Sequence, residues 1–286
     1  MPDFTFVTYD GLPDLDPDDR LAVDALARRG MRADVAVWND PAVDWSKTGV
    51  CVIRSTWDYH LHFDRFMRWA SHVDATAKGL HNPLPIIRWN AHKSYVRELA
   101  ARGAPMVPTV WIARGAEPDL GAIVRERGWT RAVIKPAVGL ATRGVIAIDD
   151  SAESIARGRV HALDLLAEHD VMVQPFIGSV ETTGERALVF IGGAYSHAAS
   201  KTAFQALAVA GAAGERPVEA EADEIAVATR VIRMAAPDLL YGRVDLVRDD
   251  EGDPLVIELE LVEPSLFLGM HPDAPDRFAR ALERYR

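Results

Sequence analysis

The sequence predicts an α/β protein that begins with a parallel sheet and continues into smaller lobes mixing helices with strands. The first observation is the order of the opening elements, which read strand, helix, strand, strand. The second is composition, because 49% apolar and 26% charged residues are ordinary for a globular protein. The third is length: 286 residues suit two or three small lobes better than one minimal core.

The opening elements define the first lobe. Segments 4–9, 33–38 and 49–54 are apolar and read as strands, and Asp16–Arg29 reads as a helix with a capping start that ends at Gly30. Ligands of parallel sheets bind at the carboxyl ends of the strands, where Arg54–Tyr59 lies. This segment either caps a helix with an aromatic rim or contacts a substrate. The second reading makes candidates of Arg54, Ser55, Trp57 and Asp58.

We divide the chain into three domains, residues 1–88, 89–178 and 179–286. Helices are predicted over 90–102, 151–168 and 221–235, and strands over 132–135, 145–148 and 171–176. Two hairpins are predicted, one from 185–192 and 194–200, the other from 241–248 and 254–261. The Ala- and Gly-rich stretch 206–214 is predicted to be a mobile loop.

Charge and cysteine content narrow the class of protein. The net charge is −10 without a Lys/Arg block, so we expect no nucleic-acid partner. No apolar run approaches the roughly 20 residues that span a bilayer, and the first residues do not resemble a signal peptide, so we expect no membrane association. The single cysteine, Cys51, indicates a reducing, cytoplasmic location.

Three carboxylates near the C-terminus are the strongest candidate site. Strand residues alternate between faces, so Asp245 shares a face with Arg243, and Glu258 shares one with Glu260. Pairing across the turn brings these side chains together, and three carboxylates repel one another unless a cation lies among them. Oxygen ligands of this kind suit Mg²⁺. Taken alone, the pattern fits a solvated acidic face with Arg243 as counter-ion slightly better than a metal site. The opposite face is predicted to hold Val244, Leu246, Ile257, Leu259 and Leu261.

Two further segments carry weaker signals. Lys135 ends an apolar strand before the loop 136–144, where it could neutralise phosphate oxygens while loop amides cover them. The loop lacks the Walker pattern, so a P-loop NTPase is not supported. Gln174-Pro175-Phe176-Ile177 ends a strand at a proline, and its free backbone groups could face a ligand such as an adenine edge. A strand-ending lysine and a plain linker are the ordinary readings of these two segments.

In this order, the segments resemble the ATP-grasp superfamily, in the branch of glutathione synthetase and D-alanine–D-alanine ligase. The resemblance covers nearly the whole chain and includes similarity to the O-ureidoserine cyclo-ligase family, which closes the ring of D-cycloserine. The similar stretches include Arg54-Ser55-x-Trp57, Tyr195-Ser196-His197-Ala198, Gly242–Arg248 and Glu258–Leu266. It implies an ATP-grasp fold, with the first lobe on the substrate side and two α+β lobes enclosing the nucleotide.

The resemblance also implies roles for individual residues. Lys93 and Lys135 would bind nucleotide phosphates, beneath a loop containing Gly139 and Gly144. Gln174, Phe176 and Ile177 would face adenine, and Glu185 the ribose; Asp245, Glu258 and Glu260 would hold two Mg²⁺, with Mn²⁺ also tolerated. Arg243 and Lys201 would act in catalysis, and Glu263 and Ser265 would join the first lobe in holding the substrate. The loop is poorer in glycine than in many relatives.

The implied reaction forms an acyl phosphate from a substrate carboxylate and ATP, which an amine-type nucleophile then attacks. We expect a small amino-acid-like substrate and, since dimers are common among similar ligases, a homodimer. Three readings remain: intramolecular cyclisation of a derivative such as O-ureidoserine, intermolecular amide formation, and a non-catalytic nucleotide-binding module. Retention of both lysines and all three carboxylates speaks against the last. A kinase that stops at phosphorylation is a further alternative.

Overall fold

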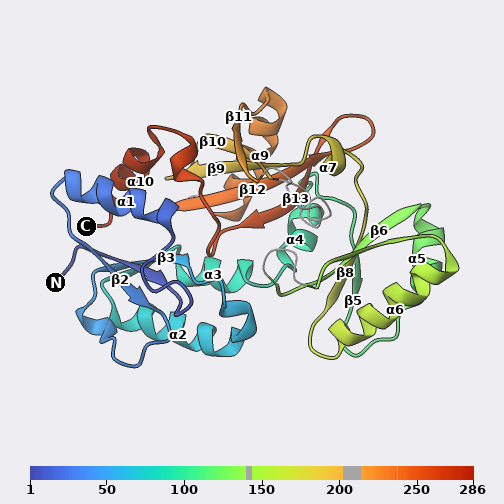
Figure 1. Cartoon of the computed structure of the whole chain (residues 1–286), viewed down its shortest axis with the longest axis horizontal. Helices are drawn as coiled ribbons and strands as arrows, with labels where there is room; N and C mark the ends of the chain where they lie inside the picture. The colour runs from blue at the N-terminus through green and yellow to red at the C-terminus, as the bar shows by residue number, and fades with distance from the viewer. Residues whose placement is uncertain (140–143, 202–213, 237) are drawn as a thin grey trace.

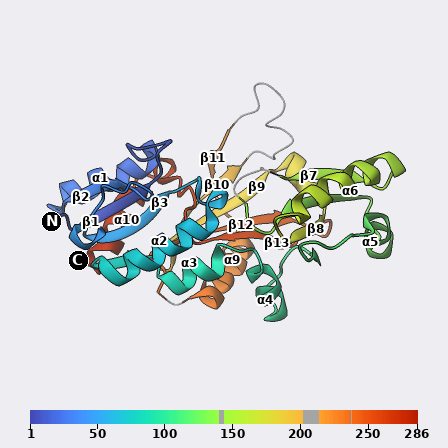
Figure 2. The same cartoon turned by 90° about the horizontal axis from the view of Figure 1, so that it is seen from below.

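Three β-sheets follow one another along the chain, each with its own helices (Figure 1). The structure, a computed structural model, describes residues 1–139, 144–201, 214–236 and 238–286. The predicted loop 206–214 therefore lies outside the described residues except for Gly214, as do positions 140–143 of the loop 136–144. Figure 2 shows the three sheets arranged along the long axis of the molecule, with the C-terminal sheet in the middle.

The first sheet is parallel, as predicted, with strand order β2-β1-β3-β4. Phe4 and Phe6 of β1 pack on one face of this sheet, and Val7 packs on the other, because strand side chains alternate. Asp16 caps the first helix by accepting a hydrogen bond from the Asp18 amide. The strands are β1 (Phe4–Thr8), β2 (Ala33–Val37), β3 (Val50–Ser55) and β4 (Gly79–His81); the helices are α1 (Pro17–Arg28), α2 (Phe63–Thr76) and α3 (Leu84–Asn90), with 3₁₀ turns at Trp45–Lys47 and Tyr59–Leu61.

The second sheet is antiparallel, with order β5-β8-β6-β7, and two helices cover it. Its strands are β5 (Val110–Ile112), β6 (Arg131–Pro136), β7 (Ile146–Asp149) and β8 (Val171–Pro175), with helices α5 (Leu120–Arg127) and α6 (Ala152–Leu166). The predicted strands and helix of this region are confirmed to within a few residues. Sequence reasoning did not predict α5.

The third sheet is antiparallel and has the order β11-β10-β9-β12-β13, so the two predicted hairpins lie side by side. Gly192 and Gly193 turn the first hairpin with φ of +61° and +79°. The strands are β9 (Glu185–Ile191), β10 (Ala194–Lys201), β11 (Arg216–Val218), β12 (Tyr241–Arg248) and β13 (Pro254–Glu260), accompanied by α7 (Ser179–Thr182) and α9 (Ala222–Ala235).

The C-terminal segment returns to the first sheet. A 3₁₀ turn (Leu268–Met270) and α10 (Ala274–Glu283) lie beside α1, and both chain ends lie at the same end of the molecule (Figures 1 and 2). Phe278 of α10 is fully buried in one core with Phe4, Phe6 and Tyr241. This core therefore joins the first sheet, the third sheet and the last helix. Among the described residues, no helix is both long and apolar enough to cross a bilayer.

The predicted helix over 90–102 is wrong in its first part. α3 ends at Asn90 and α4 (Tyr95–Ala101) begins after a break that contains Lys93. The Asn90 side chain bonds the backbone of β13 at Leu259 and Leu261, and the Lys93 amide donates to the Ala137 carbonyl at 2.8 Å. These contacts replace helical hydrogen bonds and hold Lys93 against the loop that follows β6.

Candidate active site

A cavity of about 410 Å³ lies between the second and third sheets and reaches the first lobe at Trp57. One end is mainly apolar, the middle is charged, and the far end combines aromatic and polar groups. The lining residues are Val133, Val145, Gln174, Pro175, Phe176, Ile177 and Val180 at the apolar end; Lys135, Glu185, Lys201, Glu215, Arg243, Ile257, Glu258 and Glu260 in the middle; and Trp57, Glu263, Ser265 and Phe267 at the far end.

The three carboxylates meet as predicted. Across the β12–β13 ladder, Arg243 lies opposite Glu260 and Asp245 lies opposite Glu258. Asp245, Glu258 and Glu260 each place a carboxylate oxygen within 4.8 Å of the others. Asp245 is fully buried at the base of the group. The cluster is therefore buried or partly buried, and is not a solvated acidic face.

One residue of the opposite face was placed wrongly. The β12–β13 register shifts after Asp245, so Leu246 lies opposite Val256, and Ile257 is the extra residue of a bulge. Ile257 consequently lines the cavity beside Glu258 instead of lying on the far face with Val244 and Leu259.

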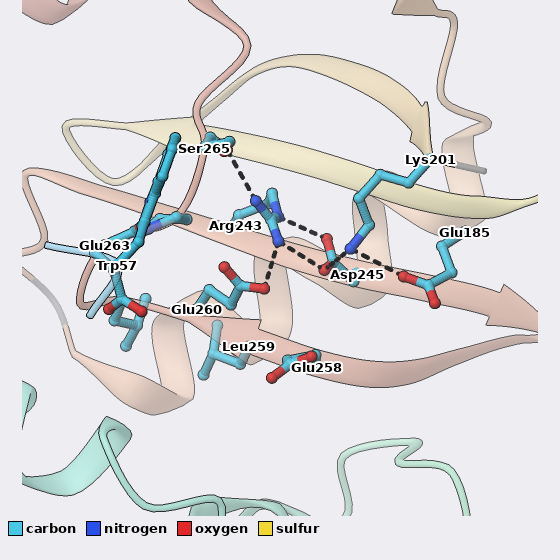
Figure 3. A network of polar contacts seen from close by, with 12 residues as sticks. Trp57, Glu185, Lys201, Arg243, Asp245, Glu258, Leu259, Glu260, Glu263 and Ser265 are labelled. Atoms are coloured by element: carbon cyan, nitrogen blue, oxygen red, sulfur yellow. Dashed lines mark hydrogen bonds and ion pairs between the residues drawn. The ribbon is translucent and has the colours of Figure 1, made fainter. Parts of the chain in front are cut away.

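Basic side chains hold the carboxylates in place (Figure 3). Arg243 donates two hydrogen bonds to Asp245, at 2.9 and 3.1 Å, and a third to Glu260. Lys201 lies 2.5 Å from Asp245 and 2.9 Å from Glu185. Among the described residues, Arg243 and Lys201 therefore neutralise part of the negative charge of these carboxylates.

The pKa values of the three carboxylates are shifted in different directions. Burial raises the pKa of Asp245, but Arg243 and Lys201 outweigh it and hold the value below its usual range. Burial also opposes ionisation of Glu258, yet Lys93 and Lys135 lower its pKa to about 2. Burial and the neighbouring carboxylates instead raise the pKa of Glu260 to about 7. A divalent cation would relieve this repulsion, and three carboxylates are donors that Mg²⁺ prefers, so the residues fit the metal.

The two predicted phosphate lysines both lie near Glu258. Lys93 is 2.5 Å from a Glu258 carboxylate oxygen and 3.3 Å from the Gly139 carbonyl oxygen. Lys135 is buried and forms no ion pair with any residue that the structure describes. Burial lowers the Lys135 pKa, although Glu258 partly opposes this. An anion would compensate the buried Lys135 charge.

The residues predicted to face adenine lie together at the apolar end of the cavity. Phe176 and Ile177 line it, and the Gln174 side chain is fixed by donation to Thr109 at 2.8 Å. The Arg131 guanidinium stacks on the Phe176 ring at 3.6 Å. Sequence reasoning missed Val133 here, although it shares a strand face with Lys135 two residues later, and that alternation was the available signal.

The loop glycines frame the cavity without lining it. The Gly139 carbonyl accepts from Lys93, and the Gly144 carbonyl lies 2.8 Å from His161. Gly144 has a φ of +74°, and a Cβ there would approach Leu165 at 3.2 Å. Gly144 therefore allows a tight return into β7.

Of the four first-lobe residues predicted to contact a substrate, the structure places only Trp57 at the cavity. Arg54 is 1% exposed, pairs with Asp19 at 2.8 Å and donates to the Pro264 carbonyl; it also stacks over Tyr241. Ser55 donates to Asp19, and Asp58 accepts from the Trp38 indole at 2.8 Å. The structure does not bring Arg54, Ser55 or Asp58 to the cavity, because their polar groups are used inside the fold.

Comparisons with solved structures identify the fold. A RimK domain protein of the ATP-grasp type from Sphaerobacter thermophilus matches with a TM-score of 0.73 at 19% identity, covering 98% of this chain and 99% of its own. D-alanine–D-alanine ligase from Bacillus anthracis, solved with ATP, matches with a TM-score of 0.67 at 12% identity, covering 100% and 97%. The fold is the ATP-grasp fold predicted from the sequence, and the protein is an ATP-dependent ligase.

Similarity in sequence is specific to one group of these ligases. The family model described as the N-terminal domain of D-cycloserine synthetase DcsG matches residues 4–82. The cycloserine biosynthesis protein DcsG of Streptomyces lavendulae is 35% identical over 277 residues, 91% of each chain. A crystal structure of D-cycloserine synthetase DcsG matches with a TM-score of 0.89 at 31% identity over 99% of both chains. The chain belongs to the DcsG family.

We expect ATP with Mg²⁺ to raise the melting temperature. Nucleotide at 100 times its Kd stabilises the folded state by about 2.7 kcal/mol, which is roughly 5–10 °C for a protein of this size. Differential scanning fluorimetry with ATP, with and without EDTA, measures the shift. The Lys135→Met variant should lose most of it, because Lys135 is the buried cation without a partner in the described chain. An unchanged melting temperature at millimolar nucleotide would indicate a degenerate site.

Proposed function

We propose that this ligase phosphorylates a substrate carboxylate with ATP and closes a ring by attack of the substrate's own amine-type nitrogen. An amino-acid derivative such as O-ureidoserine is the proposed substrate. The observation that carries the proposal is the group of Asp245, Glu258 and Glu260, which meet beside Arg243 at the middle of one cavity. The DcsG relationship over 91% of the chain supports the choice of substrate.

The proposed reaction has two steps. The substrate carboxylate attacks the γ-phosphorus of ATP, the bond to the bridging oxygen breaks, and ADP leaves. The nitrogen then attacks the acyl carbon, loses its proton, and inorganic phosphate leaves from the tetrahedral intermediate. Neither step needs a protein nucleophile, so the protein contributes positioning and charge.

Each charged residue has a part in this scheme. Asp245, Glu258 and Glu260 would hold Mg²⁺, for which we propose two ions with Mn²⁺ as a substitute; when bound, the metal neutralises phosphate charge. Lys93 and Lys135, which both lie near Glu258, bind phosphate oxygens. Arg243, fixed by Asp245 and Glu260, faces the cavity and stabilises the developing oxyanion. Lys201 positions Asp245 and Glu185.

Product analysis separates ring closure from intermolecular ligation. We expect mass spectrometry of O-ureidoserine incubated with enzyme, ATP and Mg²⁺ to show a product lighter than the substrate by one water. Hydrolysis of the remaining carbamoyl group after closure, with release of carbon dioxide and ammonia, would lower the mass further. ADP should form without a second substrate. A requirement for a separate amine would favour the intermolecular reading, and phosphorylated substrate as the final product would favour a kinase.

A further inference from the structure

Glu263 is a buried carboxylate that the reaction scheme leaves without a role. It is 6% exposed and lines the far end of the cavity. Its side chain forms neither a hydrogen bond nor an ion pair with any residue that the structure describes; only its backbone carbonyl accepts, from Trp57 at 3.4 Å. Burial raises the pKa of Glu263 well above its usual range, because an unpaired buried charge is costly. Such a carboxyl group is suited to a cation that arrives with a ligand.

The basic groups nearby serve other carboxylates. Arg243 is bonded to Asp245 and Glu260, Lys201 to Asp245, and Lys93 to Glu258. Figure 3 shows Glu263 and Trp57 on one side of Arg243, with Lys201 on the other. Glu263 does not belong to the group of carboxylates that meet within 4.8 Å, although Glu260 lies near enough to raise its pKa.

The segment that carries Glu263 is held rigidly. Arg54 donates to the Pro264 carbonyl, and Arg243 donates to the Ser265 carbonyl at 3.0 Å. His197 lies 2.9 and 3.0 Å from the next two carbonyl oxygens, those of Leu266 and Phe267. A charge fixed in this way discriminates between ligands, because it does not need to be ordered on binding.

The surroundings of Glu263 suit a small organic ammonium ion. The Trp57 ring stands beside Glu263 and is fixed to its carbonyl, and Phe267 lines the same end of the cavity. Aromatic walls with one carboxylate favour an ammonium group, which gains both an ion pair and contact with the rings. Because Arg243 bonds Ser265, two residues after Glu263, this end adjoins the place where the substrate carboxylate would react.

We propose that Glu263 binds the protonated α-amino group of the substrate, so that the enzyme selects zwitterionic amino-acid derivatives over acids that lack this amine. The inference rests on the proposed function, since it places the reacting carboxylate at Arg243. Glu263 orients the substrate so that the carboxylate, and not the amine, meets the phosphate.

The test compares two acids with two proteins. O-ureidoserine and its counterpart lacking the α-amino group are assayed with the unaltered enzyme and with Glu263→Gln, by ADP release and by calorimetry in the presence of ADP and Mg²⁺. In the unaltered enzyme, removal of the amine should lower kcat/KM roughly 100-fold, as expected for loss of a buried charged hydrogen bond. In Glu263→Gln, the same removal should cost only a few-fold, with the KM for ATP unchanged. Glu251→Gln, at an exposed turn, is the matched control.

The outcomes separate the two proposals. An equal cost of removing the amine in both proteins, with normal turnover, overturns the role of Glu263 and leaves the reaction standing. Calorimetric preference for the amine that depends on Glu263, without ADP release from either acid, overturns the reaction and leaves the binding role standing. Failure of the unaltered enzyme to bind either acid overturns both.

Discussion

Glu258→Gln is expected to abolish ATP turnover while leaving the fold intact. Glu258 pairs with Lys93, lies near Lys135 and shares the proposed metal site with Asp245 and Glu260. The amide keeps the size of the side chain but removes the charge that a hard cation requires. We expect ADP release to fall by at least about 1000-fold, a cost of about 4 kcal/mol in transition-state stabilisation.

Folding should survive this change for an electrostatic reason. The pKa of Glu260 is raised to about 7, first by burial and then by the charges of Asp245 and Glu258. Removal of the Glu258 charge therefore relieves repulsion within the group. Lys93 loses an ion pair but keeps its contact with the Gly139 carbonyl. The melting temperature should therefore stay within a few degrees of the unaltered protein.

Parallel measurements decide the matter. ADP release and thermal unfolding are recorded for Glu258→Gln and for Glu251→Gln, whose side chain lies in the exposed turn between β12 and β13. Unaltered ADP release from Glu258→Gln would refute the metal site. A large fall in melting temperature would instead assign the residue a structural role.

Arg54→Leu is expected to produce the largest loss of stability. It leaves Asp19, 4% exposed, without its ion-pair partner and removes the hydrogen bond to the Pro264 carbonyl and the stacking on Tyr241. Removing one member of a buried pair costs about 3–5 kcal/mol. Thermal unfolding should therefore shift downward by roughly 6–15 °C.

Two further variants show that the buried charge is the cause. Arg20→Leu removes an exposed arginine paired with Asp14 at 3.6 Å and should change stability by less than about 1 kcal/mol. The double variant Asp19→Leu with Arg54→Leu should regain about half of the loss or more, because both charges are then absent. Equal melting temperatures for Arg54→Leu and the unaltered protein would show that the buried contacts of Arg54 do not stabilise the fold.

The sequence predicted the site best where strand alternation alone brings the site residues to one face. Alternation along β12 and β13 places Arg243, Asp245 and Glu260 on one face, and a short turn fixes which strand pairs with which. The bulge at Ile257 was not predictable, because an extra residue in a ladder leaves no mark on apolar and polar alternation until the partner strand is known.

Long-range hydrogen bonds account for the other differences. Lys93 leaves the helical path because Asn90 bonds β13, a strand far along the chain. Arg54 looked like a ligand contact because its partners Asp19 and Pro264 are distant in sequence. Neither partner is visible from residue spacing, so a polar cluster after a strand was assigned to a substrate when part of it completes the interior.

The sharing of one core by both ends of the chain has a consequence for synthesis. Phe4 and Phe6 of β1 are buried against Phe278 of α10, with Tyr241 of β12 between the two regions. While the ribosome is still making the second and third sheets, the apolar face of β1 has no α10 to cover it. The first lobe is therefore synthesised first, but its core is complete only after α10 has been made. During that interval its uncovered apolar face is exposed to aggregation or to binding by chaperones.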